Sequence, residues 1–201
     1  MIFCVTGPMA AGKNAASDIL EKMNFACVDA DVLTHEAIEI QKKKILEAFS
    51  SKAEELKIDL LDAEGKINRR NLGKLLFTDS KLIKQQEEIV YPEVNRLFDA
   101  FILQNPGKNI VINATLLYKV PLINRVDTVI FIDCPVLKRY FRARKRDKLP
   151  SKQIWQRFKS QRNLFAKYKN SVADTRRVWN TGSRRSLEKK LQLILSDRQG
   201  I

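Results

Sequence analysis

Short apolar runs alternate with longer amphipathic stretches along most of this chain. The short runs are rich in β-branched and aromatic side chains, which is typical of strands buried in a parallel sheet. The stretches between them repeat their apolar positions at helical spacing. Strands and helices that alternate in this way predict an α/β fold, a doubly wound parallel sheet flanked by helices. The predicted strands are residues 2–6, 25–28, 110–112, 128–132 and 178–180.

The predicted helices differ in how clearly their ends are marked. Asn105, Pro106 and Gly107 give a clear stop after a long helix, which Pro92 should kink or interrupt. A turn at 65–69 leads into a helix whose apolar face holds Leu72, Leu75, Leu76 and Phe77. Residues 50–64 are polar and predict a loop or a loose helix, and residues 115–124 predict a short helical connection. The remaining helical patterns cover residues 15–23, 36–49, 81–104, 139–146, 151–168 and 186–195.

The first strand runs into the motif G-x-x-x-x-G-K, formed by Gly7, Gly12 and Lys13, and a helix follows. This is the P-loop pattern in the structural context that it requires. Its glycines let several backbone N–H groups converge on an anionic oxygen, and the following helix adds the positive end of its dipole. Lys13 would reach the β- and γ-phosphates of a nucleotide. The alternative is a Gly-rich βα turn that binds no nucleotide.

Two carboxylates follow the second predicted strand, at Asp29 and Asp31. The carboxyl ends of parallel strands border the crevice where α/β proteins bind ligands. In a phosphoryl-transfer site such a carboxylate accepts the proton of the attacking hydroxyl or helps to hold hydrated magnesium. Asp31 also suits the N-cap of the next helix, and both roles are compatible. His35, the single histidine, lies four residues later on the same helical face and is interpreted as a substrate-side or structural group.

Composition narrows the class of protein. The chain has 201 residues, a length that suits one domain with a small lid, and 44% of them are hydrophobic. No apolar run reaches membrane-spanning length, which argues against a membrane partner. Cys4, Cys27 and Cys134 lack metal-binding spacing and are interpreted as buried thiols in a reducing cytoplasm.

A basic segment follows the fourth predicted strand. With 37 basic and 23 acidic residues the net charge is +14, which fits either anionic ligands or a solvated basic surface. Two basic helices joined by a turn predict a lid that closes over phosphates, because the charge of arginine is permanent and its donors are forked. The alternative is a surface pair of helices with Trp155 and Phe158 in the core. The turn at residues 180–182 after the last predicted strand could border an adenine ring.

Taken together, the motifs resemble one family closely, the dephospho-coenzyme A kinases among the P-loop small-molecule kinases. The resemblance rests on GPMAAGKN, VDADVLTHE, GKINRRNLGKLLF, EEIVYPEV, KRDKLPSKQIWQRFKSQ and WNTG, which span nearly the whole chain. It implies a single P-loop kinase domain over residues 1–201, with a helical substrate-binding region at about 35–104 and a lid at about 138–170. Asn14 stands where the family has Ser or Thr, and Tyr91 where it usually has histidine. Asn113, Thr115 and Lys119 interrupt a stretch that usually reads Pro-Leu-Leu before a glutamate.

The resemblance also implies a role for individual residues. Asp31 would be the catalytic base toward the ribose 3′-hydroxyl, and Lys13 and Arg142 would act on the transferring phosphoryl group. The expected substrate-side residues besides Asp31 are His35, Arg69, Arg157 and Gln161. The expected ATP-binding residues are Gly7, Ala11, Gly12, Lys13, Asn14, Ala15, Ala16, Arg146 and Asn180. Asn14 would hold Mg²⁺ directly or through water, since an amide oxygen also coordinates hard cations.

The leading hypothesis is therefore ATP-dependent phosphorylation of dephospho-coenzyme A, which gives coenzyme A. One alternative is a P-loop kinase for another small alcohol or a nucleoside monophosphate. The other is a basic nucleotide- or RNA-binding module with a decayed kinase site. The chain shows no RNA-binding motif and no aromatic stacking platform, which argues against nucleic acid as a partner. The sequence leaves the oligomeric state open.

Overall fold

The computed structural model describes residues 1–147, 149–170 and 173–199. Position 148 of the predicted lid and the last two positions of the predicted domain lie outside these ranges. The chain forms two compact units. One unit joins Met1–Ala30 to the described residues from Gly107 onward, and the other is Asp31–Pro106. No helix in the described ranges is long and apolar enough to cross a membrane.

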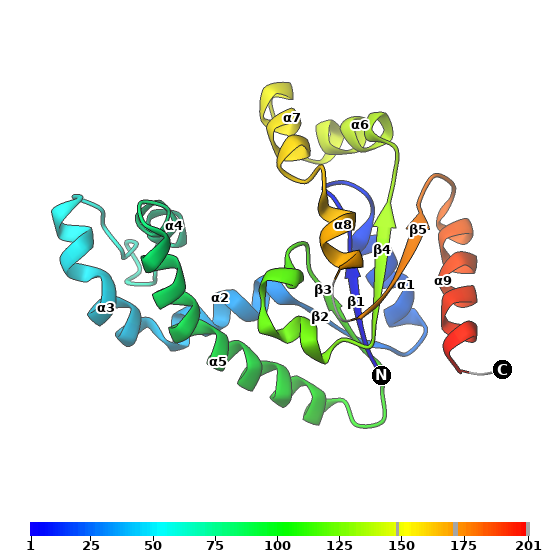
Figure 1. The fold of residues 1–201 in the computed structure, drawn as a ribbon, viewed down its shortest axis with the longest axis horizontal. Helices are drawn as coiled ribbons and strands as arrows, with labels where there is room; N and C mark the ends of the chain where they lie inside the picture. Colours follow the sequence, from blue (N-terminus) through cyan, green and yellow to red (C-terminus); the bar gives the residue numbers. More distant parts are fainter. Residues whose placement is uncertain (148, 171–172, 200–201) are drawn as a thin grey trace. The chain divides into compact units, whose positions relative to one another are not determined.

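A five-stranded parallel sheet forms the centre of the first unit, in the order β2-β3-β1-β4-β5 (Figure 1). The predicted fold class is therefore confirmed. β1 is the middle strand, and its Val5 lies beside Asn113 of β3 and Ile130 of β4. The strands are β1 Ile2–Thr6, β2 Ala26–Asp29, β3 Ile110–Asn113, β4 Thr128–Asp133 and β5 Asp174–Trp179.

The last strand is longer than its apolar pattern predicted. β5 begins at Asp174 rather than at Val178, because Thr175, Arg176 and Arg177 also pair with β4. β5 lies at the edge of the sheet with β4 as its neighbour, and its Arg176, Arg177 and Trp179 are exposed. An edge strand of this kind needs no continuous apolar run, so its first half carried no strand signal.

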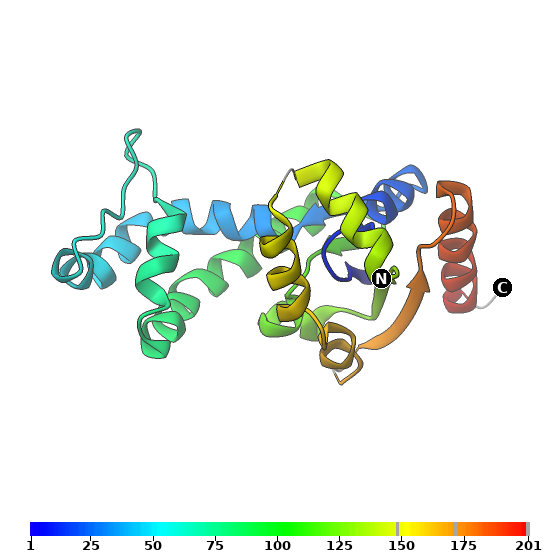
Figure 2. The ribbon, with the colours of Figure 1, turned by 90° about the horizontal axis from the view of Figure 1, so that it is seen from above.

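Helices cover both faces of the sheet (Figure 2). Ile130, Ile132 and Val178 pack with α1 and α9 in one buried cluster. Phe131 faces the other way and meets Phe165 of α8 with their ring centroids 5.0 Å apart. The α-helices of this unit are α1 Lys13–Lys22, α6 Val136–Asp147, α7 Ser151–Ser160, α8 Leu164–Lys169 and α9 Arg184–Gln199.

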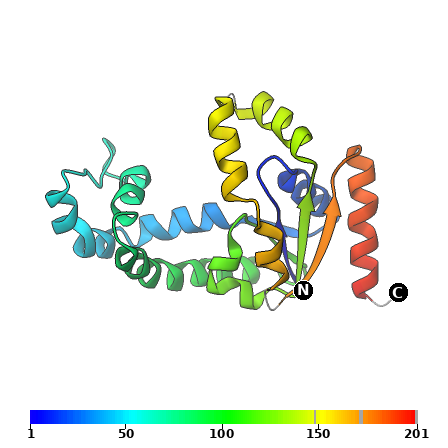
Figure 3. The same cartoon turned by 45° about the horizontal axis from the view of Figure 1, so that its top comes forward.

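Two of the predicted helices in this unit were wrong in detail. The helix expected over residues 151–168 is two helices, because turns at residues 161–163 separate α7 from α8. The connection expected over residues 115–124 consists of two 3₁₀ segments, η1 Leu117–Lys119 and η2 Pro121–Arg125. Pro121 lacks the N–H that a continuous helix would need at that point. Figure 3 shows α6 and α7 beyond the carboxyl end of β4.

The unit Asp31–Pro106 is helical, with α5 packed against α3 and α4. The helix predicted to continue over residues 36–49 is interrupted, since a turn at Gln41 separates two helices, and the second extends beyond the predicted end to Glu55. α5 passes through Pro92 without an interruption. Phe77 ends α4 and is 84% exposed, so it does not belong to the apolar face. The helices are α2 Ala30–Ile40, α3 Lys42–Glu55, α4 Arg69–Leu76 and α5 Ser80–Gln104.

Candidate active site

The loop between β1 and α1 has a backbone that only glycine fits at two positions. Gly7 has φ +146°, and a Cβ there would lie 2.0 Å from the carbonyl oxygen of Ile132. Gly12 has φ +109°, and its Cβ would lie 2.2 Å from Nδ2 of Asn180. Both values of φ belong to the region that L side chains rarely adopt. The glycines of the sequence motif are therefore required by close backbone approach as well as by backbone conformation.

A cavity of about 580 Å³ opens beside this loop, within the first unit. Its ionisable lining residues are all basic, namely Lys13, Arg142, Lys145 and Arg146. The start of α1 also faces it through Asn14 and Ala15, so the positive end of the helix dipole adds to the side-chain charge. The cavity is therefore suited to an anion. Lys13 Nζ donates to the carbonyl of Gly7 at 3.1 Å, and Arg146 pairs with Asp147 at 2.6 Å.

Three predicted nucleotide-binding residues hold the loop rather than line this cavity. The amide of Ala11 donates to the carbonyl of Pro8 at 3.1 Å, and that of Ala16 donates to the carbonyl of Gly12 at 3.1 Å. The buried Asn180 donates from Nδ2 to the carbonyl of Ala11 at 2.8 Å. Arg142 Nη1 reaches the same carbonyl at 3.3 Å. The side chain of Asn180 thus ties the end of β5 to the phosphate loop.

Hard oxygen ligands converge at the carboxyl ends of β2 and β3. Nδ2 of Asn113 lies 3.2 Å from Oδ2 of Asp29 and 3.2 Å from Oδ1 of Asn14. Carboxylate and amide oxygens are the ligand atoms that Mg²⁺ prefers, and water and phosphate oxygens would complete its coordination shell. The donor set therefore fits magnesium, although no group of three His, Cys, Asp or Glu side chains with metal-binding geometry occurs in the described ranges. Asp29 is one of the two carboxylates noted after the second predicted strand, but no individual role was predicted for it.

The substrate-side predictions fall partly in the second unit. His35 and Arg69 line one cavity of about 400 Å³, together with Glu39 and Lys66. Asp31 is exposed in the first turn of α2, which begins at Ala30 rather than after Asp31. Asp31 is therefore a residue of the first helical turn and not the N-cap.

The remaining two substrate-side predictions lie on α7 or just after it. Oε1 of Gln161 accepts a hydrogen bond of 2.7 Å from the amide of Met9 in the phosphate loop, so this side chain supports the loop. Arg157 is exposed. Phe158 is buried as the alternative reading of this segment expected, but Trp155 is 48% exposed and that part was wrong.

The three cysteines are free thiols. Cys4 and Cys134 are buried as predicted, and burial raises the pKa of both. Cys27 is only partly buried, which corrects the prediction, and its surroundings raise its pKa to about 11, mainly through burial and then through Glu21. All three thiols are therefore protonated at neutral pH and poor nucleophiles.

Comparison with known proteins assigns the chain to a family. A sequence model of the family described as dephospho-CoA kinase matches residues 1–182. The dephospho-CoA kinase of Treponema denticola is 36% identical over 195 residues, which cover 93% of this chain and 85% of the relative. That of Treponema pallidum is 34% identical, covering 96% of this chain and 93% of the relative.

Solved structures agree with this assignment. A dephospho-CoA kinase from Campylobacter jejuni superposes with a TM-score of 0.60 at 25% identity, covering 98% of this chain and 96% of that one. A Thermus thermophilus protein superposes with a TM-score of 0.80 at 24% identity, covering 98% and 97%, and shares the fold. The sequence match and the fold lead to one conclusion: the chain belongs to the dephospho-CoA kinase family.

Proposed function

We propose that this protein transfers the γ-phosphoryl group of ATP to the ribose 3′-hydroxyl of dephospho-coenzyme A and so forms coenzyme A. The observation that carries the proposal is the basic cavity beside the phosphate loop, in a chain whose family match extends through both compact units. We take the two units as one kinase domain. Its lid would be residues 138–170, and residues 35–104 would receive the coenzyme side.

The phosphates of ATP would occupy the cavity lined by Lys13, Arg142 and Arg146. For this Lys13 Nζ must leave the carbonyl of Gly7, to which it donates at 3.1 Å, and losing such a bond from a charged group costs about 1.5–3 kcal/mol net. Phosphoryl transfer needs positioning and neutralisation of charge more than covalent chemistry. The three cations supply that neutralisation, and the forked donors of the arginines hold the phosphoryl oxygens in a fixed orientation.

Asp31 would accept the proton of the 3′-hydroxyl as that oxygen attacks phosphorus. Chain connectivity keeps Cα of Asp31 within about 7 Å of Cα of Asp29, at the carboxyl end of β2. His35 and Arg69 would bind the coenzyme side through the cavity that they line.

Asp29 and Asn14 would hold magnesium through the oxygens that meet at Asn113. Bound there, the ion would neutralise negative charge on the β- and γ-phosphates. Asn113 keeps both oxygens in place, because its amide group lies 3.2 Å from each of them. We also place the protein in the cytoplasm, since three free thiols suit a reducing compartment.

The test is incubation with ATP, magnesium and dephospho-coenzyme A, followed by mass spectrometry of the products. We expect a coenzyme product heavier by one phosphoryl group, lost in Asp31→Asn with little change in ATP affinity. Asp18→Asn makes the same chemical change on an exposed carboxylate of α1 and should keep the wild-type rate. A wild-type rate in Asp31→Asn would remove Asp31 as the base, and no product in the wild-type protein would refute the proposed reaction.

A further inference from the structure

A second cavity of about 520 Å³ lies in the first unit, on the face of the sheet opposite α1 and α9. It shares no lining residue with the phosphate cavity. We call it the β4–α7 pocket, because β4, β5, α6, α7 and α8 all line it. Its central lining residues are Phe131, Asp133, Arg139, Trp155, Phe158 and Trp179.

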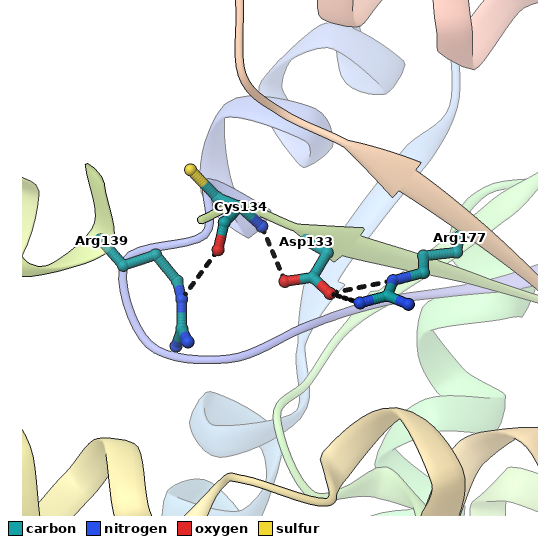
Figure 4. A network of polar contacts seen from close by, with 4 residues as sticks. All are labelled: Asp133, Cys134, Arg139 and Arg177. Carbon is teal, nitrogen blue, oxygen red and sulfur yellow. Dashed lines mark hydrogen bonds and ion pairs between the residues drawn. The ribbon is translucent and has the colours of Figure 1, made fainter. Parts of the chain in front are cut away.

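One carboxylate and one arginine of this pocket already satisfy each other. Asp133 forms an ion pair with Arg177 of β5, whose Nε donates at 2.9 Å (Figure 4). The other carboxylate oxygen accepts from the amide of Cys134 at 2.7 Å. The Arg177 guanidinium also stacks over the rings of Phe165 and Trp179, 4.7 and 4.5 Å from their centroids. The negative charge of Asp133 is thus neutralised by Arg177.

Arg139 is the second arginine of the pocket, and its bonding is incomplete. It is only 8% exposed, and its Nε donates to the carbonyl of Cys134 at 3.0 Å (Figure 4). Its Nη1 is buried and has no hydrogen-bond partner among the residues that the structure describes. Burial lowers the pKa of this guanidinium, although arginine keeps its charge in proteins. A buried cation with an unused donor is costly unless an anion or a polar group completes its bonding.

One aromatic ring contacts this cation, and a second ring packs on the first. The guanidinium carbon of Arg139 lies 4.5 Å from the ring centroid of Phe158, and Trp155 packs edge-to-face on Phe158 with centroids 5.7 Å apart. Lys159 and Arg162 are exposed at the rim and add two positive charges to a lining whose single carboxylate is Asp133. The pocket therefore joins an unsatisfied positive charge to faces on which a ring can stack.

We propose that the β4–α7 pocket is a second ligand site, separate from the phosphate cavity, for a small molecule that carries an anionic group on an aromatic ring. The anion binds the guanidinium of Arg139 where this residue lines the pocket, and the ring stacks against Trp155, Phe158 and Trp179. Because Arg139 comes from α6 and Phe158 from α7, the ligand joins both helices to β4. The proposal needs no catalytic activity, so it stands apart from the proposed reaction.

Intrinsic fluorescence tests the site directly, because the only two tryptophans of the chain, Trp155 and Trp179, both line this pocket. We would titrate phenyl phosphate in the presence of saturating ADP and magnesium, which fill the phosphate cavity. We expect a saturable change in emission, with inorganic phosphate and benzyl alcohol each binding at least tenfold more weakly. Inorganic phosphate carries the anionic group without the ring, and benzyl alcohol carries the ring without the anionic group.

Variants then locate the binding. Arg139→Gln should weaken phenyl phosphate at least tenfold, since it removes a charge-assisted bond. Arg144→Gln removes the same charge from an exposed position of α6 and should leave the affinity unchanged. Arg139→Lys keeps the charge without the fork, so it should fall between them, and it provides a second variant if the glutamine form does not fold.

Three results would overturn the site. These are no saturable change in the wild-type protein with or without ADP, equal weakening in Arg139→Gln and Arg144→Gln, or a saturable change that is seen only without ADP. The last would place the probe in the phosphate cavity. None of them depends on turnover, so loss of the second site and loss of the proposed kinase reaction are separate findings.

Discussion

Substitution of Gly12 by alanine should disturb the phosphate loop through one identified partner. The new Cβ would lie 2.2 Å from Nδ2 of Asn180, well inside van der Waals contact. Its next neighbour outside Asn180 is Arg142 Nη1 at 3.9 Å, an ordinary contact. The substitution therefore displaces the amide of Asn180, which donates to the carbonyl of Ala11 at 2.8 Å, and leaves Arg142 in place.

The loss of folding stability expected for Gly12→Ala has two parts. An L side chain at φ +109° is strained by about 1–3 kcal/mol. Loss of the Asn180 bond costs about 0.5–1.5 kcal/mol more, since Arg142 Nη1 still reaches the carbonyl of Ala11 at 3.3 Å. Gly12→Ala should therefore lower the free energy of unfolding by about 1.5–4.5 kcal/mol, a large part of the roughly 5–15 kcal/mol typical of a domain. Asn180→Ala alone should cost about 0.5–1.5 kcal/mol, because it loses only the second part.

A double-mutant cycle separates these parts. Adding Asn180→Ala to Gly12→Ala should cost almost nothing further, because the bond is already broken. We would measure urea unfolding by far-ultraviolet circular dichroism. Gly73→Ala is the matched control, since its Cβ meets nothing within 4 Å inside α4, and it should gain about 0.5–1 kcal/mol.

Additive costs for Gly12→Ala and Asn180→Ala, to within about 0.5 kcal/mol, would refute this reasoning. Additivity would mean that a Cβ on Gly12 leaves the amide of Asn180 in place. An unchanged stability in Gly12→Ala would also show that the loop tolerates a side chain at this φ. In either case the tie between β5 and the phosphate loop would not depend on Gly12.

Three further variants test other parts of the site. Lys13→Ala should weaken ATP binding and slow turnover together, since the cavity loses a cation; unchanged kinetics would exclude the nucleotide from this cavity. Asn14→Ala should raise the magnesium concentration that gives half the maximal rate several-fold, and an unchanged requirement would remove Asn14 from the metal site. The hydrogen bond from Arg96 holds the pKa of Glu93 below its ordinary value. Ionised Glu93 therefore stabilises the fold at pH values above the ordinary pKa. This stabilisation is lost as the pH falls through the lowered pKa of the folded protein. Urea unfolding should therefore show Glu93→Gln less stable than the wild type at neutral pH, with a gap that shrinks in acid; a gap that does not change with pH would contradict this.

The phosphate loop could be predicted from the sequence because its geometry is local. Gly7 and Gly12 mark two backbone positions of unusual φ, and the strand before them and the helix after them carry clear apolar patterns. The loop motif itself includes Lys13, the family resemblance added Arg142, and both line the basic cavity.

The remaining features depend on contacts that no local pattern encodes. Asp29 lies beside Asn113 only because β2 pairs with β3, and the strand order was not predictable from apolar runs. The turns after α7 contain neither glycine nor proline, so no helix-breaking residue marks them. The pairing of Asp133 with Arg177, 44 residues along the chain, likewise follows from the pairing of β4 with β5.

The position of β1 in the middle of the sheet has a consequence for synthesis on the ribosome. The strand that carries the phosphate loop leaves the ribosome first, yet its sheet neighbours are β3 and β4. Its first residues bond to Asn109 and Asp127, more than a hundred residues later. The helices of Asp31–Pro106 contact one another and can pack before β3 and β4 are available to pair with β1. Nascent chains that stop before Ile110 therefore carry the whole phosphate-loop sequence with no strand to hold it, and the loop takes its shape only late in translation.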